Sequence, residues 1–123
     1  MIGYVTIGTN DLEKAEAFYT ALLGETLGAK ILMQDDRMRF YGTGPGAPIL
    51  ALCIPYDKQA ATHGNGTMVA LAAGSRENAD KLYAKAIELG ATSEGEPGER
   101  MPGFYGGYFR DLDGNKMVAF HMG

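Results

Sequence analysis

The chain has 123 residues, the size of one compact domain, and 46% of them are apolar, which argues for a folded core. Its one cysteine and two histidines exclude an internal disulfide, a cysteine-based zinc site and an iron–sulfur cluster. The net charge of −4 argues against a nucleic-acid-binding surface, and no apolar stretch is long enough to span a bilayer.

The first half of the chain predicts a strand, a helix and three further strands. Residues 2–7 alternate in polarity, which is typical of a half-buried strand. Helix-capping residues at 9–11 precede apolar positions at helical spacing, and Gly24 is expected to end this helix. The remaining expected strands cover residues 29–33, 37–41 and 48–54, the first two as a hairpin.

The second half repeats this order after a polar connector. A strand at 67–73 leads through Ser75, a helix-capping residue, to an amphipathic helix that Gly90 is expected to end. The Gly- and Pro-rich residues 95–103 predict a long segment that lies over a cleft as a lid, stays solvated, or packs in part across a dimer interface. The last two expected strands, joined by a turn, are residues 104–110 and 116–121.

These two halves are related as an internal repeat. Residues 8–11 have a counterpart at 74–77, and Gly24 has its counterpart in Gly90 at the same offset. One module of roughly 60 residues cannot easily close its sheet alone, whereas two modules side by side can. The sequence therefore predicts a structure built from two similar modules.

Two motifs resemble a known family. The first motif is residues 9–12, which precede a helix containing Phe18 and Tyr19, and the second is the segment 109–116. Both resemble the glyoxalase / bleomycin-resistance / extradiol-dioxygenase family, the vicinal oxygen chelate superfamily. In the second motif the family usually has proline where this chain has Leu112. The resemblance covers both halves of the chain and implies paired βαβββ modules whose curved sheets surround a central cleft. Members of this family with one such pair per chain often dimerise.

We therefore expect an α+β protein of paired βαβββ modules with curved mixed sheets enclosing a cleft. The expected organisation is a single glyoxalase-like domain over residues 1–123, with module one at about 1–57 and module two at about 66–123. No signal peptide is recognisable, and one unpaired cysteine suits a reducing compartment, so the expected location is cytoplasmic.

The resemblance implies a metal site whose ligands are missing here. Family enzymes usually bind a divalent metal through His or Glu on the first, fourth, fifth and eighth strands. The corresponding positions of this chain are Tyr4, Ala51, Met68 and Val118. Alanine and valine have no donor atom, and a thioether or neutral phenol is a poor ligand for a hard divalent ion. We therefore expect no metal and no other cofactor.

Strand alternation separates the side chains that pack on helices from those that face the cleft. Arg37 and Arg39 share one face of their strand, where they either clamp a carboxylate or phosphate or protect a solvated edge. A closed core filled by the cleft-side residues remains the alternative to a binding site. The expected ligand-binding residues are Tyr4, Thr6, Arg39, Ala51, Met68, Tyr108, Val118 and Phe120.

Several other polar residues have two interpretations. His63 is either a general base near the cleft mouth or an exposed loop histidine, and His121 is expected at the surface or an interface. Cys53 has no cationic neighbour in sequence and is expected to be a buried, inert thiol. Residues 111–115 superficially resemble a calcium loop, but their spacing predicts a turn between two strands.

These observations lead to two functional hypotheses. The first is metal-independent binding of a small, partly aromatic organic molecule by a homodimer, similar to sequestration in the bleomycin-resistance branch. The second is a lyase, isomerase or dioxygenase that uses a displaced metal site or an acid–base pair drawn from Tyr4, Tyr108, His63 and Arg39. Neither hypothesis requires a nucleic acid or a membrane as a partner.

Overall fold

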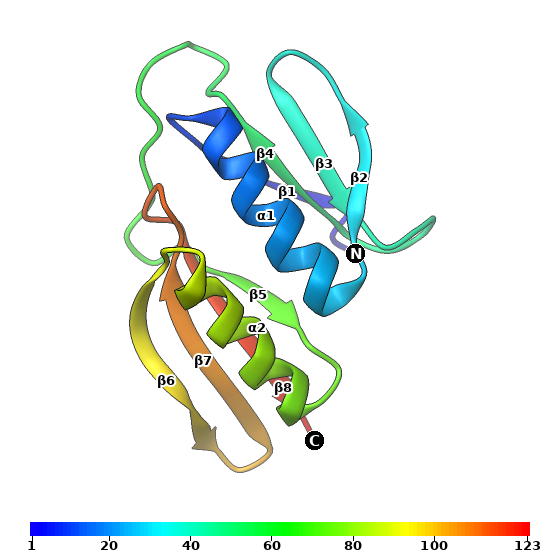
Figure 1. Ribbon diagram of the computed structural model, residues 1–123, viewed down its shortest axis with the longest axis vertical. Coiled ribbons are helices and arrows are strands. Elements are labelled where there is room, and N and C mark those ends of the chain that lie inside the picture. Colours follow the sequence, from blue (N-terminus) through cyan, green and yellow to red (C-terminus); the bar gives the residue numbers. More distant parts are fainter. The chain divides into compact units, whose positions relative to one another are not determined.

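The computed structural model describes residues 1–123 as two compact units, residues 1–62 and 63–123. Each unit contains one helix and one four-stranded sheet, in the order strand, helix, three strands (Figure 1). The fold is thus α+β with two mixed sheets, and the prediction of paired βαβββ modules is confirmed.

The first unit has a mixed sheet in the order β1-β4-β3-β2. Strand β1 runs parallel to β4, and the other neighbouring pairs are antiparallel. Its elements are β1 (Tyr4–Gly8), α1 (Leu12–Leu27), β2 (Lys30–Gln34), β3 (Met38–Gly42) and β4 (Ile49–Cys53).

Helix α1 begins where the sequence predicts but ends later. The Asp11 carboxylate accepts a hydrogen bond from the backbone N–H of Lys14 at 3.1 Å and so caps the first turn. The helix continues through Gly24 and ends at Gly28, so the predicted end at Gly24 was wrong. Gly28 has a φ of 68°, a left-handed conformation that glycine adopts without strain, whereas Gly24 merely weakens a helix that the sheet supports.

The second unit repeats this topology, with its sheet in the order β5-β8-β7-β6 and β5 parallel to β8. Ser75 caps α2 by accepting the N–H of Asn78 at 3.0 Å, and the helix ends just before Gly90, as predicted. Its elements are β5 (Val69–Ala72), α2 (Arg76–Glu88), β6 (Thr92–Met101), β7 (Phe104–Arg110) and β8 (Lys116–Met122).

The Gly- and Pro-rich segment 95–103 forms most of an edge strand, so the prediction of a lid or solvated loop was wrong. Strand β6 pairs antiparallel with β7 as a hairpin. The pairing shifts register at three places, and such bulges allow Pro97 and several glycines in a strand. The backbone bonds to β7 thus outweigh the turn tendency of the local sequence.

Each helix packs on one face of its own sheet and buries an apolar core there. We call the other face of each sheet, which its own helix does not cover, the open face. From the strand register, the first open face carries Tyr4, Thr6, Met38, Phe40, Ile49, Ala51 and Cys53. By the same reasoning the second open face carries Ala70, Phe104, Tyr108, Arg110, Lys116, Val118 and Phe120.

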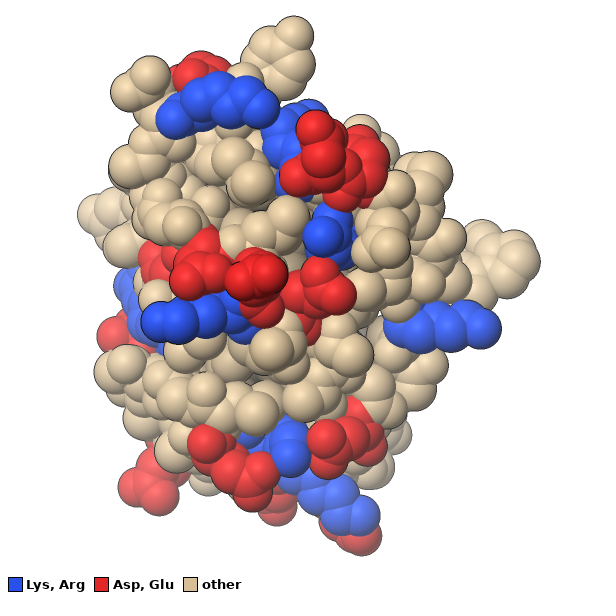
Figure 2. All heavy atoms as spheres, turned by 45° about the horizontal axis from the view of Figure 1, so that its top comes forward, with Lys and Arg blue, Asp and Glu red and all other residues tan.

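The structure contains no helix that is both long and apolar enough to cross a membrane. On the face drawn in Figure 2, acidic and basic side chains lie in mixed groups of both signs. This mixture agrees with the composition of 11 basic and 15 acidic residues. The face shown therefore lacks the extended basic surface that phosphate backbones require.

Candidate functional site

The first open face brings together three predicted site residues from two parallel strands. Tyr4 lies beside Ile49, and Thr6 lies beside Ala51. The ring of Tyr4 meets the ring of Phe40 edge to face, with centroids 5.7 Å apart. Tyr4 is 59% exposed, so one side of this aromatic pair is open to a ligand.

Phe40 was missed in the sequence-based prediction because the wrong face of β3 was chosen. Its neighbour Arg39 lies opposite Leu52, a fully buried residue on the side covered by α1. The Nε of Arg39 donates to Glu16 Oε1 at 2.6 Å, and the Arg39 side chain is only 18% exposed. Arg39 therefore lies on the opposite face from Thr6 and Ala51 and is bound to α1, not placed among them.

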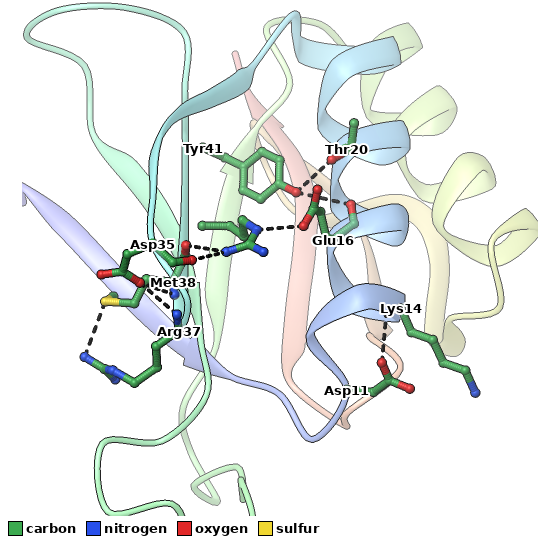
Figure 3. Close-up of polar contacts among 9 residues, drawn as sticks. Asp11, Lys14, Glu16, Thr20, Asp35, Arg37, Met38 and Tyr41 are labelled. Atoms are coloured by element: carbon green, nitrogen blue, oxygen red, sulfur yellow. Dashed lines mark hydrogen bonds and ion pairs between the residues drawn. The ribbon is translucent and has the colours of Figure 1, made fainter.

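A tight turn held by Asp35 joins β2 to β3. Asp35 accepts the backbone N–H groups of Arg37 and Met38, each at 2.8 Å (Figure 3). These two hydrogen bonds lower the pKa of Asp35, with the charge of Arg37 adding to the effect. They hold the turn from which β3 begins, and the pairing of Arg39 with Leu52 of β4 then fixes the face of the β3 side chains.

Tyr41 anchors α1 to β3. Its hydroxyl lies 2.8 Å from Thr20 Oγ1 and donates to the backbone carbonyl of Glu16 at 3.1 Å (Figure 3). Burial raises the pKa of Tyr41, because the phenolate would be poorly solvated there. The neutral phenol is thus a structural link between helix and sheet.

Raising the pH above about 10 is expected to lower the free energy of unfolding, because the phenol of Tyr41 ionises more easily in the unfolded chain. The stabilisation is complete below the unfolded pKa and is lost as the pH rises through the higher folded pKa. Tyr41→Phe should flatten this decline and cost about 1 kcal/mol at neutral pH through its lost hydrogen bonds. Urea titrations between pH 7 and 11 measure both effects.

Part of the alkaline decline should remain in Tyr41→Phe. The hydroxyl of Tyr105 donates to Asp80 Oδ1 at 2.6 Å, and this hydrogen bond raises the pKa of Tyr105. The free energy of unfolding of the wild type and of Tyr41→Phe can be plotted against pH. If the two plots stay parallel from pH 7 to 11, Tyr41 does not cause the alkaline loss of stability.

Cys53 lies at the end of β4 and is half-buried. Burial raises the pKa of its thiol, and the positive charge of Arg37 opposes that effect. Since the thiolate is the reactive form, this environment favours an unreactive thiol.

The second open face places three more of the predicted residues together. Tyr108 lies beside Val118, and Phe120 follows two positions along β8 on the same side. The rings of Phe104 and Phe120 are stacked, with centroids 5.5 Å apart. Met68 lies just before β5 and is exposed. The sequence-based prediction did not include Phe104, although Phe104 and Tyr108 are four positions apart on one strand and so lie on the same face.

Charged side chains surround Tyr108 on this face. The guanidinium carbon of Arg100 lies 5.3 Å from the ring centroid of Tyr108, and Lys116 Nζ lies 5.6 Å from it. Glu94 Oε1 is 3.3 Å from Arg110 Nε and 3.8 Å from Lys116 Nζ. The second open face therefore combines an aromatic surface with a cluster of cations.

His63 and the segment 111–115 lie in or beside a turn, whereas His121 lies within β8. The turn 111–115 is held by Asp111, whose Oδ1 accepts the N–H groups of Asp113 and Asn115 at 2.9 Å each. His63 packs against Gly114, where a Cβ atom would lie 2.5 Å from His63 Cε1. This geometry is that of a tight turn between two strands, as predicted.

The donor set does not fit a divalent metal ion. Tyr4, Ala51, Met68 and Val118 occupy the four positions expected for ligands, and none offers the carboxylate or imidazole that such ions prefer. Across residues 1–123, no group of three or more His, Cys, Asp or Glu side chains is arranged to hold a metal. No step involving a metal is therefore derived for these faces.

Comparisons with known proteins agree with this fold. The family model "Glyoxalase/Bleomycin resistance protein/Dioxygenase superfamily" matches residues 1–118. A glyoxalase/bleomycin resistance protein from Albidiferax ferrireducens T118 is 41% identical, with a TM-score of 0.91 over 100% of this chain and 99% of that one. A hypothetical protein from S. aureus is 29% identical, with a TM-score of 0.72 over 96% of this chain and 90% of that one.

A putative glyoxalase from Bacillus halodurans is 26% identical, with a TM-score of 0.77 over 96% of this chain and 92% of that one. No curated protein matches the chain.

Proposed function

The chain belongs to the glyoxalase/bleomycin resistance protein/dioxygenase superfamily, and we propose that within it this protein binds a small organic molecule on its open sheet faces without a metal ion. One observation carries the proposal. The resemblance places the usual metal ligands of family enzymes at Tyr4, Ala51, Met68 and Val118, none of which has a carboxylate or imidazole, and of these Tyr4 and Met68 are exposed to an organic ligand.

The chemistry of the first open face supports this proposal. Tyr4 and Phe40 offer a large aromatic contact at low conformational cost, and Thr6 adds a hydroxyl beside them. Ligand sites are mostly apolar surfaces with a few polar groups that fix orientation. The second open face also carries aromatic side chains, Phe104 and Phe120, together with Tyr108, and adds a cluster of cations.

The mode of action that we propose is sequestration by a homodimer in the cytoplasm. Ile2, Leu32 and Met33 are exposed apolar side chains of the first unit, which a second copy of the chain would cover. Light scattering of the purified protein at twice the mass of one chain would support the dimer, and a monomer at all concentrations would overturn it.

The enzymatic alternative has no comparable support. Arg39 is bound to Glu16 on the helix side of its sheet, and His63 packs on Gly114. Both were candidates for an acid–base site. We therefore propose binding alone.

The neutral aromatic probe 1-naphthol tests the proposed function. It should shift the backbone amide resonances of Thr6, Phe40 and Ala51, while those on the α1 side of the sheet stay unchanged. Tyr4→Ser should weaken binding about fivefold, because it removes the exposed half of the aromatic pair. The control is Tyr56→Ser, since Tyr56 is 84% exposed and lies outside the sheet.

Equal effects of Tyr4→Ser and Tyr56→Ser would overturn the assignment to the first open face. A stoichiometric divalent metal in the purified protein, whose removal abolishes binding, would overturn the metal-independent mode. Both measurements use the full chain.

A further inference from the structure

We propose that the second open face binds the carboxylate of an aromatic acid, with Arg100 and Lys116 as its anchors. The inference rests on the proposed function, because it names the class of ligand for one of the same open faces. It is carried by three features of this face: a fixed guanidinium, an excess of positive charge and an adjoining apolar surface.

The guanidinium of Arg100 occupies space that two glycines leave empty. A Cβ atom at Gly98 would lie 2.8 Å from Arg100 Nη1, and one at Gly95 would lie 3.1 Å from Nη2. The same guanidinium lies over the ring of Tyr108 and donates to the backbone carbonyl of Glu96. These contacts hold a flexible side chain in one place and reduce the entropy that binding would cost.

The charges around Tyr108 do not cancel. The single carboxylate of Glu94 is shared by Arg110 and Lys116, whereas Arg100 forms no ion pair. The three cations around Tyr108 thus share one paired carboxylate, in a chain whose net charge is −4. An anion placed there gains charge-assisted hydrogen bonds from donors that are already in position.

The carboxylate of Glu99 does not neutralise this cluster. It pairs with Arg76 at 3.3 Å, and Arg76 lies at the start of α2, over the ring of Tyr105. Tyr105 in turn donates to Asp80 of the same helix. Glu99 therefore forms its ion pair with Arg76 on the helix side of the sheet and not with Arg100.

An apolar surface adjoins the guanidinium. Gly98 lies opposite Gly106, where a Cβ atom would come within 3.0 Å of Val118 Cγ2 and 3.3 Å of Phe104 Cε1. Gly106 and Tyr108 are two positions apart on the same side of β7, which corresponds to about 7 Å along the strand. That span matches a fused aromatic ring bearing a carboxylate, with the ring on the partly exposed pair Phe104 and Phe120.

The matched probes 1-naphthoate and 1-naphthol test this inference, because they share a ring system and differ in charge. The intact protein should bind 1-naphthoate about five to ten times more tightly than 1-naphthol at low salt. Added salt should reduce the preference, because the site is open to solvent. Tyrosine fluorescence or amide chemical shifts give both dissociation constants.

Two variants should abolish the preference for the acid. Arg100→Gln removes the positive charge. Gly98→Ala keeps that charge but displaces the guanidinium that carries it. Gly98 has no left-handed φ and its close neighbour is the end of a flexible side chain, so the alanine variant should fold. The controls are Lys81→Gln, an exposed lysine on α2, and Gly3→Ala, which meets no atom within 4 Å.

The possible failures are distinguishable. If neither probe binds, the proposed function fails and the inference fails with it. If 1-naphthol binds and 1-naphthoate binds no better, or if Arg100→Gln retains the preference, only the carboxylate site is overturned. Loss of the preference in Lys81→Gln would also overturn it, since the effect would then be one of net charge.

Discussion

Replacing Phe109 with alanine is expected to lower the free energy of unfolding by about 3–5 kcal/mol. Phe109 is 0% exposed and lies on β7 beside Met117 of β8, which is also fully buried. Both residues are on the side of the sheet that α2 covers. The surrounding structure cannot collapse fully into the space of a removed ring, so a cavity adds to the loss of buried apolar area.

Phe104→Ala on the same strand is the matched control. Phe104 lies on the second open face, half-buried against Phe120, and its removal should cost about 1–2 kcal/mol. Urea denaturation followed by circular dichroism measures both variants. Equal losses would contradict the assignment of the two phenylalanines to opposite faces, on which the candidate binding surface depends.

Asp111→Ala is expected to lower the free energy of unfolding by about 2–4 kcal/mol, although it removes no apolar area. Asp111 is 6% exposed. Its carboxylate accepts the N–H groups of Asp113 and Asn115, and also the side-chain amide of Asn115 at 3.0 Å. Removing the acceptor leaves donors with little access to water, which costs more than the hydrogen bonds themselves contribute.

Thermal unfolding of Asp111→Ala and of Leu112→Ala separates this role from general damage to the turn. Leu112 is exposed, so its truncation should cost less than about 1 kcal/mol. Calcium should leave the midpoint of the wild-type protein unchanged, because the carboxylate of Asp111 is already occupied by N–H donors. A calcium-dependent rise in the midpoint would show that the turn is an ion site after all.

Local patterns predicted most of the elements. The cap at Ser75, the strand over residues 104–110 and the helix end before Gly90 depend on residues close in sequence, and each is found where it was predicted. The predicted helix end at Gly24 failed because a glycine inside a helix costs only about 1 kcal/mol, which packing against a sheet offsets. Predictions of this kind hold when no distant contact opposes them.

The candidate site was predicted in part. Tyr4, Thr6 and Ala51 share one open face, and Tyr108, Val118 and Phe120 share the other, as the alternation along their strands predicted. Phe40 and Phe104 were missed, and Arg39 lies apart from its predicted neighbours. Whether these faces bind a ligand stays a prediction until the probes are measured.

The amino-acid sequence by itself predicted that this protein is an α+β pair of βαβββ modules, which the structure confirms, and its family resemblance implies that Tyr4, Ala51, Met68 and Val118 stand at the usual metal-ligand positions. Only the tertiary structure decided which face of β3 carries Arg39 and that β6 is a strand with Arg100 lying over its glycines. The reason is that a shift of one residue in strand register moves every side chain to the other face. Register is set by hydrogen bonds between distant segments, which no local pattern contains.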